Sequence, residues 1–130
     1  MHPLQRTHLG IQADLVGEVE SVGDGQATVA LVATAAMAAD DRGLVHGGFT
    51  FGLADYAAMV AVNDPFVVLG AATCKLLAPV RVGDRMVARA KISVEKGRRR
   101  VVAVTVAVDG RTVLEAELTT YVLDGHVLDG

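Results

Sequence analysis

The sequence predicts an α+β fold in which an antiparallel sheet wraps around one long, buried helix. Three observations lead to this prediction. The 130 residues are 52% hydrophobic but only 4% aromatic and contain no tryptophan, so valine, alanine, leucine and methionine must form the core. Residues 48–62 form an apolar run of helical length, and strand-like runs precede and follow it. The length fits one compact domain, which we expect to cover residues 1–130.

The segment before the helix predicts a hairpin and a short connection. Two β-rich runs lie between Leu15 and Ala33, on either side of Gly23-Asp24-Gly25, a sequence typical of a tight hairpin turn. Residues 35–41 are rich in alanine and end in Asp40-Asp41. We expect them to form a loop or a short helical turn.

The predicted helix contains a single charged residue. Between Gly43 and Asn63 that residue is Asp55, and the helix is expected to end at Asn63-Asp64-Pro65. Because apolar residues occupy all sides of the run rather than one stripe, the helix should be buried nearly all round. In a domain of this size, the concave face of a curved sheet is the place for it.

The rest of the sequence predicts about four antiparallel strands. Residues 66–80 form a long apolar run that turns at Val82-Gly83-Asp84. From residue 86 to 95, apolar and polar residues alternate with a period of two, as in a half-exposed strand. The dipeptides Lys96-Gly97 and Asp109-Gly110 mark hairpin turns around residues 99–108, and residues 112–122 complete the predicted sheet.

Composition excludes several classes of function. The net charge is -3 and the pI about 5.7, which gives no electrostatic reason to expect nucleic acid or an anionic membrane as the main partner. No uncharged stretch reaches the roughly 18 residues of a membrane span, and the start of the sequence lacks a signal peptide, so we expect a soluble, cytoplasmic protein. The apolar content exceeds what so short a chain easily buries, which predicts an obligate homo-oligomer.

No cofactor or metal is expected. The four histidines lack metal-ligand spacing, and one cysteine, Cys74, excludes an intrachain disulfide framework. Because Cys74 lies in an apolar strand-like run, we expect it to be a small buried hydrophobe rather than a nucleophile.

Asp55 is the strongest candidate for chemistry. A carboxylate inside a buried helix costs several kcal/mol unless something compensates it. The approach Val45-His46-Gly47-Gly48 leaves free backbone N–H groups at the helix start, where the dipole favours a negatively charged oxygen. The alternative is that Asp55 only bonds a neighbouring strand or a partner helix.

Two motifs resemble those of a known family. His46-Gly47-Gly48, followed after six residues by Asp55, resembles the H-G-G-x6-D signature of the PaaI-like, phenylacetate-pathway type of hotdog-fold thioesterase. The segment from Pro79 to Asp84 resembles that family's Pro-Val-x-x-Gly-Asp corner. The resemblance implies the hotdog fold, a homodimer or a dimer-of-dimers tetramer, active sites at the subunit interface and an acyl-CoA thioester as substrate.

The resemblance also assigns roles to individual residues. It puts the catalytic acid on Asp55 and the carbonyl-polarising backbone N–H on Gly47. Where many members have Asn or Gln six residues before the histidine, this sequence has Asp40, which cannot donate a hydrogen bond to the thioester oxygen. Either Asp40 binds water or substrate differently, or the activity is altered. Some lipid-synthesis repressors have effector domains on this scaffold that bind malonyl-CoA, so the alternative is a non-catalytic acyl-CoA binding or sensing protein. A ligand-free dimerisation module is a third hypothesis.

The remaining candidates have two interpretations each. Asp55 would act as general base on a water, which we prefer, or as nucleophile. His46 would orient substrate or water, or else fix the start of the helix. Four residues belong to the core or an interface by default, and one or two of them would otherwise line the acyl pocket: Phe49, Phe51, Tyr56 and Met59. Lys96, Arg98 and Arg100 form a solvated hairpin tip by default and would otherwise bind the phosphates of coenzyme A. Gly48 is also a candidate substrate-binding residue. The acyl chain, and coenzyme A against an acyl-carrier protein, stay open.

Overall fold

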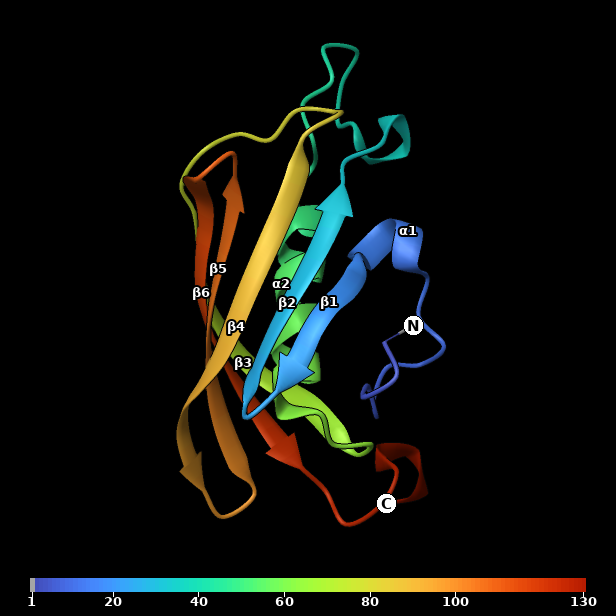
Figure 1. The fold of residues 1–130 in the computed structure, drawn as a ribbon, viewed down its shortest axis with the longest axis vertical. Coiled ribbons are helices and arrows are strands. Elements are labelled where there is room, and N and C mark those ends of the chain that lie inside the picture. Colours follow the sequence, from blue (N-terminus) through green and yellow to red (C-terminus); the bar gives the residue numbers. More distant parts are fainter. Residues whose placement is uncertain (1) are drawn as a thin grey trace.

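The computed structural model describes residues 2–130, and these form one antiparallel sheet packed on a long helix (Figure 1). The strands lie in the order β1-β2-β4-β5-β6-β3. The strands are β1 (Glu18–Gly23), β2 (Gln26–Val32), β3 (Val67–Leu76), β4 (Arg85–Lys96), β5 (Arg99–Val108) and β6 (Arg111–Val122). The helices are α1 (Ala13–Val16) and α2 (Gly47–Val62), with 3-10 turns η1 (Ala35–Met37) and η2 (Val127–Asp129).

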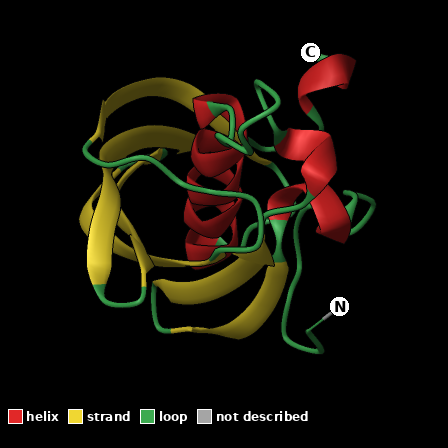
Figure 2. Cartoon of the chain, turned by 90° about the horizontal axis from the view of Figure 1, so that it is seen from above, coloured by secondary structure: helices red, strands yellow, loops and turns green. Residues whose placement is uncertain are grey.

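The sheet curves around α2, as the view from above shows (Figure 2). This is the hotdog fold that the resemblance implied, and the predicted α+β order is confirmed. Nine of the sixteen residues of α2 are buried, among them Leu53, Ala57 and Val60, which have no exposed surface. No helix within residues 2–130 is long and apolar enough to cross a membrane.

The hairpin turns follow from the predicted turn residues. Asp24 and Gly25 both have positive φ (56° and 73°), as do Asp109 and Gly110 (48° and 78°). Two consecutive left-handed residues are the requirement of a type I′ turn, whose twist matches that of the strands it joins. The helix stop is confirmed as well, since Asn63 caps α2 at φ 56° and donates its backbone N–H to the Met59 carbonyl (2.9 Å).

The N-terminal arm, residues 2–12, is held on α2 and was not predicted from the sequence. The buried Gln5 donates from Nε2 to the Tyr56 hydroxyl (2.8 Å). Asn63 accepts from the Arg6 N–H (2.7 Å) and donates to the Leu4 carbonyl (3.0 Å). The arm therefore covers Tyr56 and the C-terminal half of α2.

Two details differ from the sequence prediction. The first hairpin begins at Glu18 because Leu15 lies in α1. Cys74 is exposed, so the expectation of a buried cysteine was wrong. The reason is that β3 is an edge strand. It pairs only with β6, and nearly all of it, from Leu69 to Leu76, is exposed despite its apolar sequence.

We predict that Leu53→Ala lowers the free energy of unfolding by about 2–5 kcal/mol, because it opens a cavity between α2 and the sheet. Chemical denaturation at one fixed protein concentration measures this loss. The matched control is Leu128→Ala, since the Leu128 side chain is 85% exposed. Equal stability of the two variants would contradict the assignment of Leu53 to the core.

Candidate active site

The segment before α2 is clamped between two other segments. The His46 N–H donates to the Met37 carbonyl (2.9 Å), and the Val45 N–H donates to the Val80 carbonyl (2.9 Å). Val45 also forms an isolated antiparallel bridge with Ala38. These backbone bonds fix the position and direction of the first turn of α2.

Both glycines of the first turn lie close to exposed side chains, which would have to shift to make room for a Cβ atom. A Cβ atom on Gly47 would lie 3.0 Å from Cδ1 of Leu76, and one on Gly48 would lie 2.8 Å from Nε2 of His46. The His46 ring therefore lies directly over Gly48, and its other neighbour is Phe49, in an edge-to-face contact with a centroid distance of 6.1 Å. This packing favours the structural role of His46.

The first two N–H groups of α2 are available to a ligand. The Phe49 N–H donates to the His46 carbonyl (3.0 Å), whereas the N–H groups of Gly47 and Gly48 have no acceptor within residues 2–130. No side chain caps this end of the helix. Free donors at the positive end of the helix dipole can stabilise an oxyanion.

Asp55 lies on the less buried side of α2, and its carboxylate has no hydrogen-bond partner in the part of the chain that the structure describes. That side also carries Gly48, Phe51, Gly52 and Val62. The Oδ1 atom of Asp55 is buried and unbonded within residues 2–130. Burial raises the pKa of the Asp55 carboxyl above its ordinary value of 3.8. Such a carboxylate is a stronger base than an exposed one, because desolvation disfavours its charged form.

Asp55 and the Gly47 N–H of one chain are too far apart to act on the same carbonyl group. Eight residues of α-helix rise about 12 Å along the axis and turn about 80° around it. A cavity of about 330 Å³ lies beside the helix start, and Asp55 is not among its lining residues. Its lining residues are Val45, Gly47, Thr50, Leu76, Leu77, Ala78, Pro79 and Val80.

Asp40 is engaged within its own loop. Its Oδ1 atom accepts hydrogen bonds from the backbone N–H groups of Arg42 (2.9 Å) and Leu44 (3.2 Å). This carboxylate therefore shapes the turn that leads to the clamped segment before α2. An asparagine could accept the same two bonds through its side-chain oxygen.

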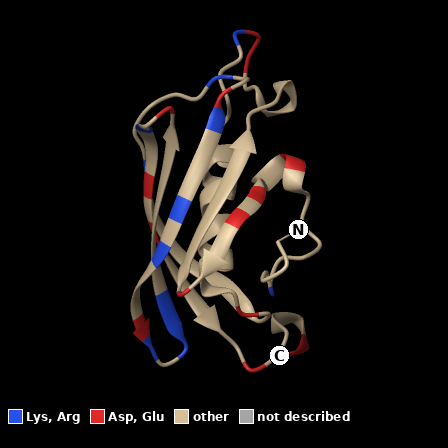
Figure 3. Ribbon diagram, in the orientation of Figure 1, with Lys and Arg blue, Asp and Glu red and all other residues tan. Residues whose placement is uncertain are grey.

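The other candidate residues lie apart from the helix start. Tyr56 and Met59 are buried, and the Tyr56 hydroxyl is bonded to Gln5. The basic cluster at the β4–β5 hairpin lies at the opposite end of α2 (Figures 1 and 3). There, Arg100 lines a cavity together with Ala61 and Val62.

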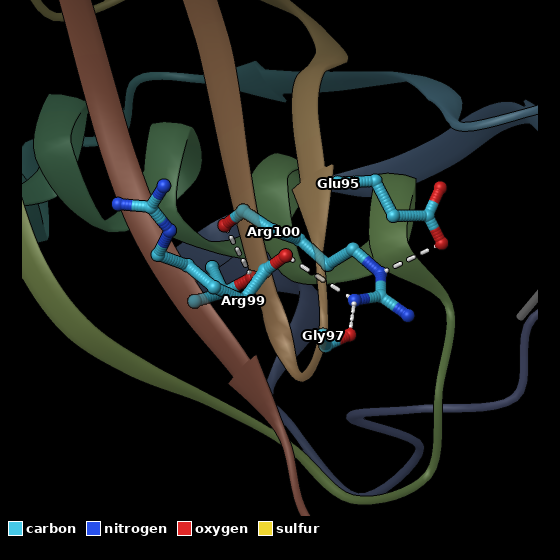
Figure 4. A network of polar contacts seen from close by, with 5 residues as sticks. Glu95, Gly97, Arg99 and Arg100 are labelled. Atoms are coloured by element: carbon cyan, nitrogen blue, oxygen red, sulfur yellow. Dashed lines mark hydrogen bonds and ion pairs between the residues drawn. The ribbon is translucent and has the colours of Figure 1, made fainter.

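Two cations of the β4–β5 hairpin are already paired. Arg100 bonds Glu95 (3.0 Å) and the Gly97 carbonyl (2.6 Å), as Figure 4 shows. Arg98 bonds Asp124. Sequence proximity suggested a free basic patch at Lys96, Arg98 and Arg100, but the pairing partners of two of them could not be read from spacing. Within residues 2–130, no group of three or more His, Cys, Asp or Glu side chains could hold a metal ion.

Comparison with known sequences identifies one family and several relatives. The profile of the thioesterase superfamily matches residues 42–116. A methylthioribose-1-phosphate isomerase of Aquifex aeolicus (strain VF5) is 48% identical over 118 residues, 91% of this chain but only 26% of that protein. The transcription factor FapR of Caldanaerobacter subterraneus is 28% identical over 124 residues, 95% of this chain and 61% of that protein. The chain thus spans about a quarter and about three fifths of these two relatives.

Solved structures agree closely with the fold. An uncharacterized protein of Pyrococcus horikoshii is 50% identical, with a TM-score of 0.95 and 96% of each chain covered. The PaaI protein of the E. coli phenylacetic acid degradation operon is 27% identical, with a TM-score of 0.79, and 86% of this chain and 83% of that chain are covered. A hypothetical thioesterase of Streptococcus pneumoniae, solved with coenzyme A, is 21% identical, with a TM-score of 0.76, and 84% and 87% of the two chains are covered.

We predict that Asp55→Asn raises the free energy of unfolding at pH 7, because burial disfavours the charged form of the wild-type carboxyl. The pKa of Asp55 is higher in the folded state than in the unfolded state. The wild type therefore regains its lost free energy of unfolding as the pH falls through the raised pKa, and the gain is complete below the ordinary value of 3.8. Thermal unfolding between pH 7 and pH 3.5 measures the difference. Asp124→Asn is the control of opposite sign, because Arg98 lowers the pKa of Asp124. A constant gap between Asp55→Asn and the wild type would contradict the prediction.

Proposed function

Because the chain belongs to the thioesterase superfamily, we propose that it hydrolyses an acyl-CoA thioester, with Asp55 as general base and the Gly47 N–H as oxyanion donor. The observation that carries the proposal is that, within residues 2–130, α2 presents a buried carboxylate oxygen without a hydrogen-bond partner and two free N–H groups. The similarity in fold to a thioesterase solved with coenzyme A supports the choice of carrier.

The chemistry needs no strong acid. The Asp55 carboxylate removes a proton from water, and the water oxygen bonds to the carbonyl carbon. The carbonyl electron pair moves onto oxygen, which accepts a hydrogen bond from the Gly47 N–H. The intermediate collapses, the C–S bond breaks with its electron pair on sulfur, and the proton on Asp55 passes to the thiolate. An ordinary thiol has a pKa of about 8.5, so the thiolate is a good leaving group. The products are a carboxylic acid and a free thiol.

The proposed site is built from two copies of the chain. The 12 Å rise between Gly47 and Asp55 means that one helix supplies the N–H and a partner helix the carboxylate. The edge strand β3 supports such pairing, since it is ten residues long, apolar and exposed, with only Lys75 charged. A long, exposed, apolar edge is a template for pairing with a strand of another chain. A two-fold dimer through β3 would contain two equivalent sites, and a tetramer would be a dimer of such dimers.

A second candidate function is acyl-CoA binding without hydrolysis. The 28% identity to the transcription factor FapR favours it. The two functions differ in what they require of Asp55, because a binding protein has no use for a buried base. A wild-type protein that binds acyl-CoA and releases no thiol would support the second function.

We predict that Asp55→Asn lowers kcat at least about 100-fold on the best acyl-CoA, because it removes the base and keeps the size of the side chain. Thiol release over a panel of short, medium, aryl and dicarboxylic acyl-CoAs measures this change and also identifies the acyl group. The control is Asp14→Asn in α1, an exposed acid. Activity of Asp55→Asn within threefold of the wild type would contradict the role.

We predict that two inactive variants restore activity when they are mixed. Gly47→Pro removes the N–H while keeping a residue that suits the first helical position, so its homodimer lacks the oxyanion donor. Unfolding and refolding it with Asp55→Asn forms heterodimers that have one intact site each, with about a quarter of the wild-type activity expected. Light scattering tests the oligomer directly. A monomer of 13.5 kDa at micromolar concentration, or no recovery on mixing, would contradict the shared site.

A further inference from the structure

We propose that a notch between residues 40–44 and 79–81 binds the phosphate at the end of the carrier's pantetheine arm. We call it the Arg42–Arg81 notch. This inference rests on the proposed function and adds to it the part of the protein that holds the carrier. It replaces the β4–β5 hairpin, which lies at the other end of α2, as the site of phosphate recognition.

The notch is a cavity of about 200 Å³ beside the start of α2. Its lining residues are Asp40, Arg42, Leu44, Pro79 and Arg81. Leu44 forms an antiparallel bridge with Arg81, and the Val82 N–H donates to the Gly43 carbonyl (2.9 Å). Two paired backbone segments thus carry the two arginines, so that their guanidinium groups can converge on one ligand.

The two guanidinium groups are free to take a phosphate. Neither the Arg42 nor the Arg81 side chain forms a hydrogen bond or an ion pair within residues 2–130. The arginines at positions 85, 98 and 100 are instead paired with Glu20, Asp124 and Glu95. A guanidinium group suits phosphate because its N–H donors form two parallel bonds to it.

The two carboxylates near the notch each accept hydrogen bonds from backbone N–H groups. Asp40 lines the cavity, and its carboxylate accepts two backbone N–H groups through Oδ1. Asp84 accepts the Arg81 N–H (2.8 Å) through Oδ2. The three charged lining residues sum to one positive charge. Removal of the Asp40 charge should therefore strengthen phosphate binding, whereas loss of either arginine should weaken it.

The notch and the cavity beside the oxyanion donor are neighbours that share one lining residue. Pro79 lines both the notch and the cavity beside Gly47. Leu44, the pairing partner of Arg81, precedes Gly47 by three residues, which is at most about 11 Å of extended backbone. Apart from Thr50, the cavity in between is lined by apolar residues and Gly47. A carbonyl at Gly47, an uncharged flexible arm and a terminal phosphate fit this order, and a phosphopantetheine thioester has all three parts.

The test compares three thioesters of one acyl group, carried on pantetheine, on 4′-phosphopantetheine and on coenzyme A. We expect the double variant Arg42→Gln/Arg81→Gln to raise KM at least tenfold for the two phosphate-bearing substrates, with kcat within twofold. The pantetheine thioester should be unaffected, because uniform binding energy changes KM alone. The matched control is Arg89→Gln/Arg99→Gln, which removes two exposed charges from β4 and β5.

A second variant tests the sign of the effect. Asp40→Asn keeps an oxygen for the two loop N–H groups and removes the charge, so KM should fall for the phosphate-bearing substrates only. Comparing an acylated carrier protein with the acyl-CoA as substrates shows which of the two carriers supplies the phosphopantetheine. A Lys96→Gln/Arg98→Gln/Arg100→Gln variant that raises KM in place of the notch variant would overturn the proposal.

The failure of the notch and the failure of the proposed hydrolysis give different results. Normal hydrolysis with unchanged KM in Arg42→Gln/Arg81→Gln would overturn the notch and leave the hydrolase intact. So would an equal effect on the pantetheine thioester, or an effect confined to coenzyme A. If the wild type binds coenzyme A in calorimetry without hydrolysing any thioester, a tenfold weaker Kd in the variant still supports the notch. Absence of coenzyme A binding to the wild type would overturn it.

Discussion

The rest of the structure depends on the packing of α2 against the concave face of the sheet. Leu53, Ala57 and Val60 are fully buried there, so the helix is held as a rigid element. Because the helix rises 1.5 Å per residue, this rigidity also sets the spacing of its polar groups. Free N–H groups are presented at one end and a carboxylate about 12 Å away, an arrangement that serves one carbonyl only when two helices are combined.

At Asp55, the stability of the fold and the proposed chemistry favour different side chains. Its buried, unbonded oxygen makes the charged form unfavourable, so the fold would be more stable with a neutral residue at this position. The same desolvation makes the carboxylate a stronger base. A cost of this kind is typical of sites where function, rather than packing, determines the residue.

Basic side chains gather at the β4–β5 hairpin near one end of α2, and two further arginines line a cavity near its other end. At the β4–β5 hairpin, Arg98 and Arg100 are bonded to neighbouring acids or to a carbonyl group. Near the start of α2, Arg42 and Arg81 come from distant parts of the sequence and lie against one cavity. The run of basic residues in the sequence therefore favoured the hairpin as the phosphate site, whereas the unpaired arginines in the structure favour the notch. Ion pairing accounts for the difference, because a guanidinium group already bonded to a carboxylate has fewer donors left for a ligand.

The sequence by itself determined the elements of the fold and the residues of the helix start. Strands with period-2 alternation and turns with Asp-Gly can be predicted from residue spacing, because each depends only on local backbone geometry. Asp55 could be found in the same way, because it is the one charged residue in the apolar run of the helix. Only the tertiary structure decided that β3 is an exposed edge, that the His46 ring covers Gly48, and that Asp40 closes its own loop. It also decided that the N-terminal arm reaches Tyr56 and that Leu44 pairs with Arg81. These contacts depend on the curvature and strand order of the sheet, which bring distant parts of the sequence together. They therefore cannot be predicted from the residue pattern of any single strand or helix.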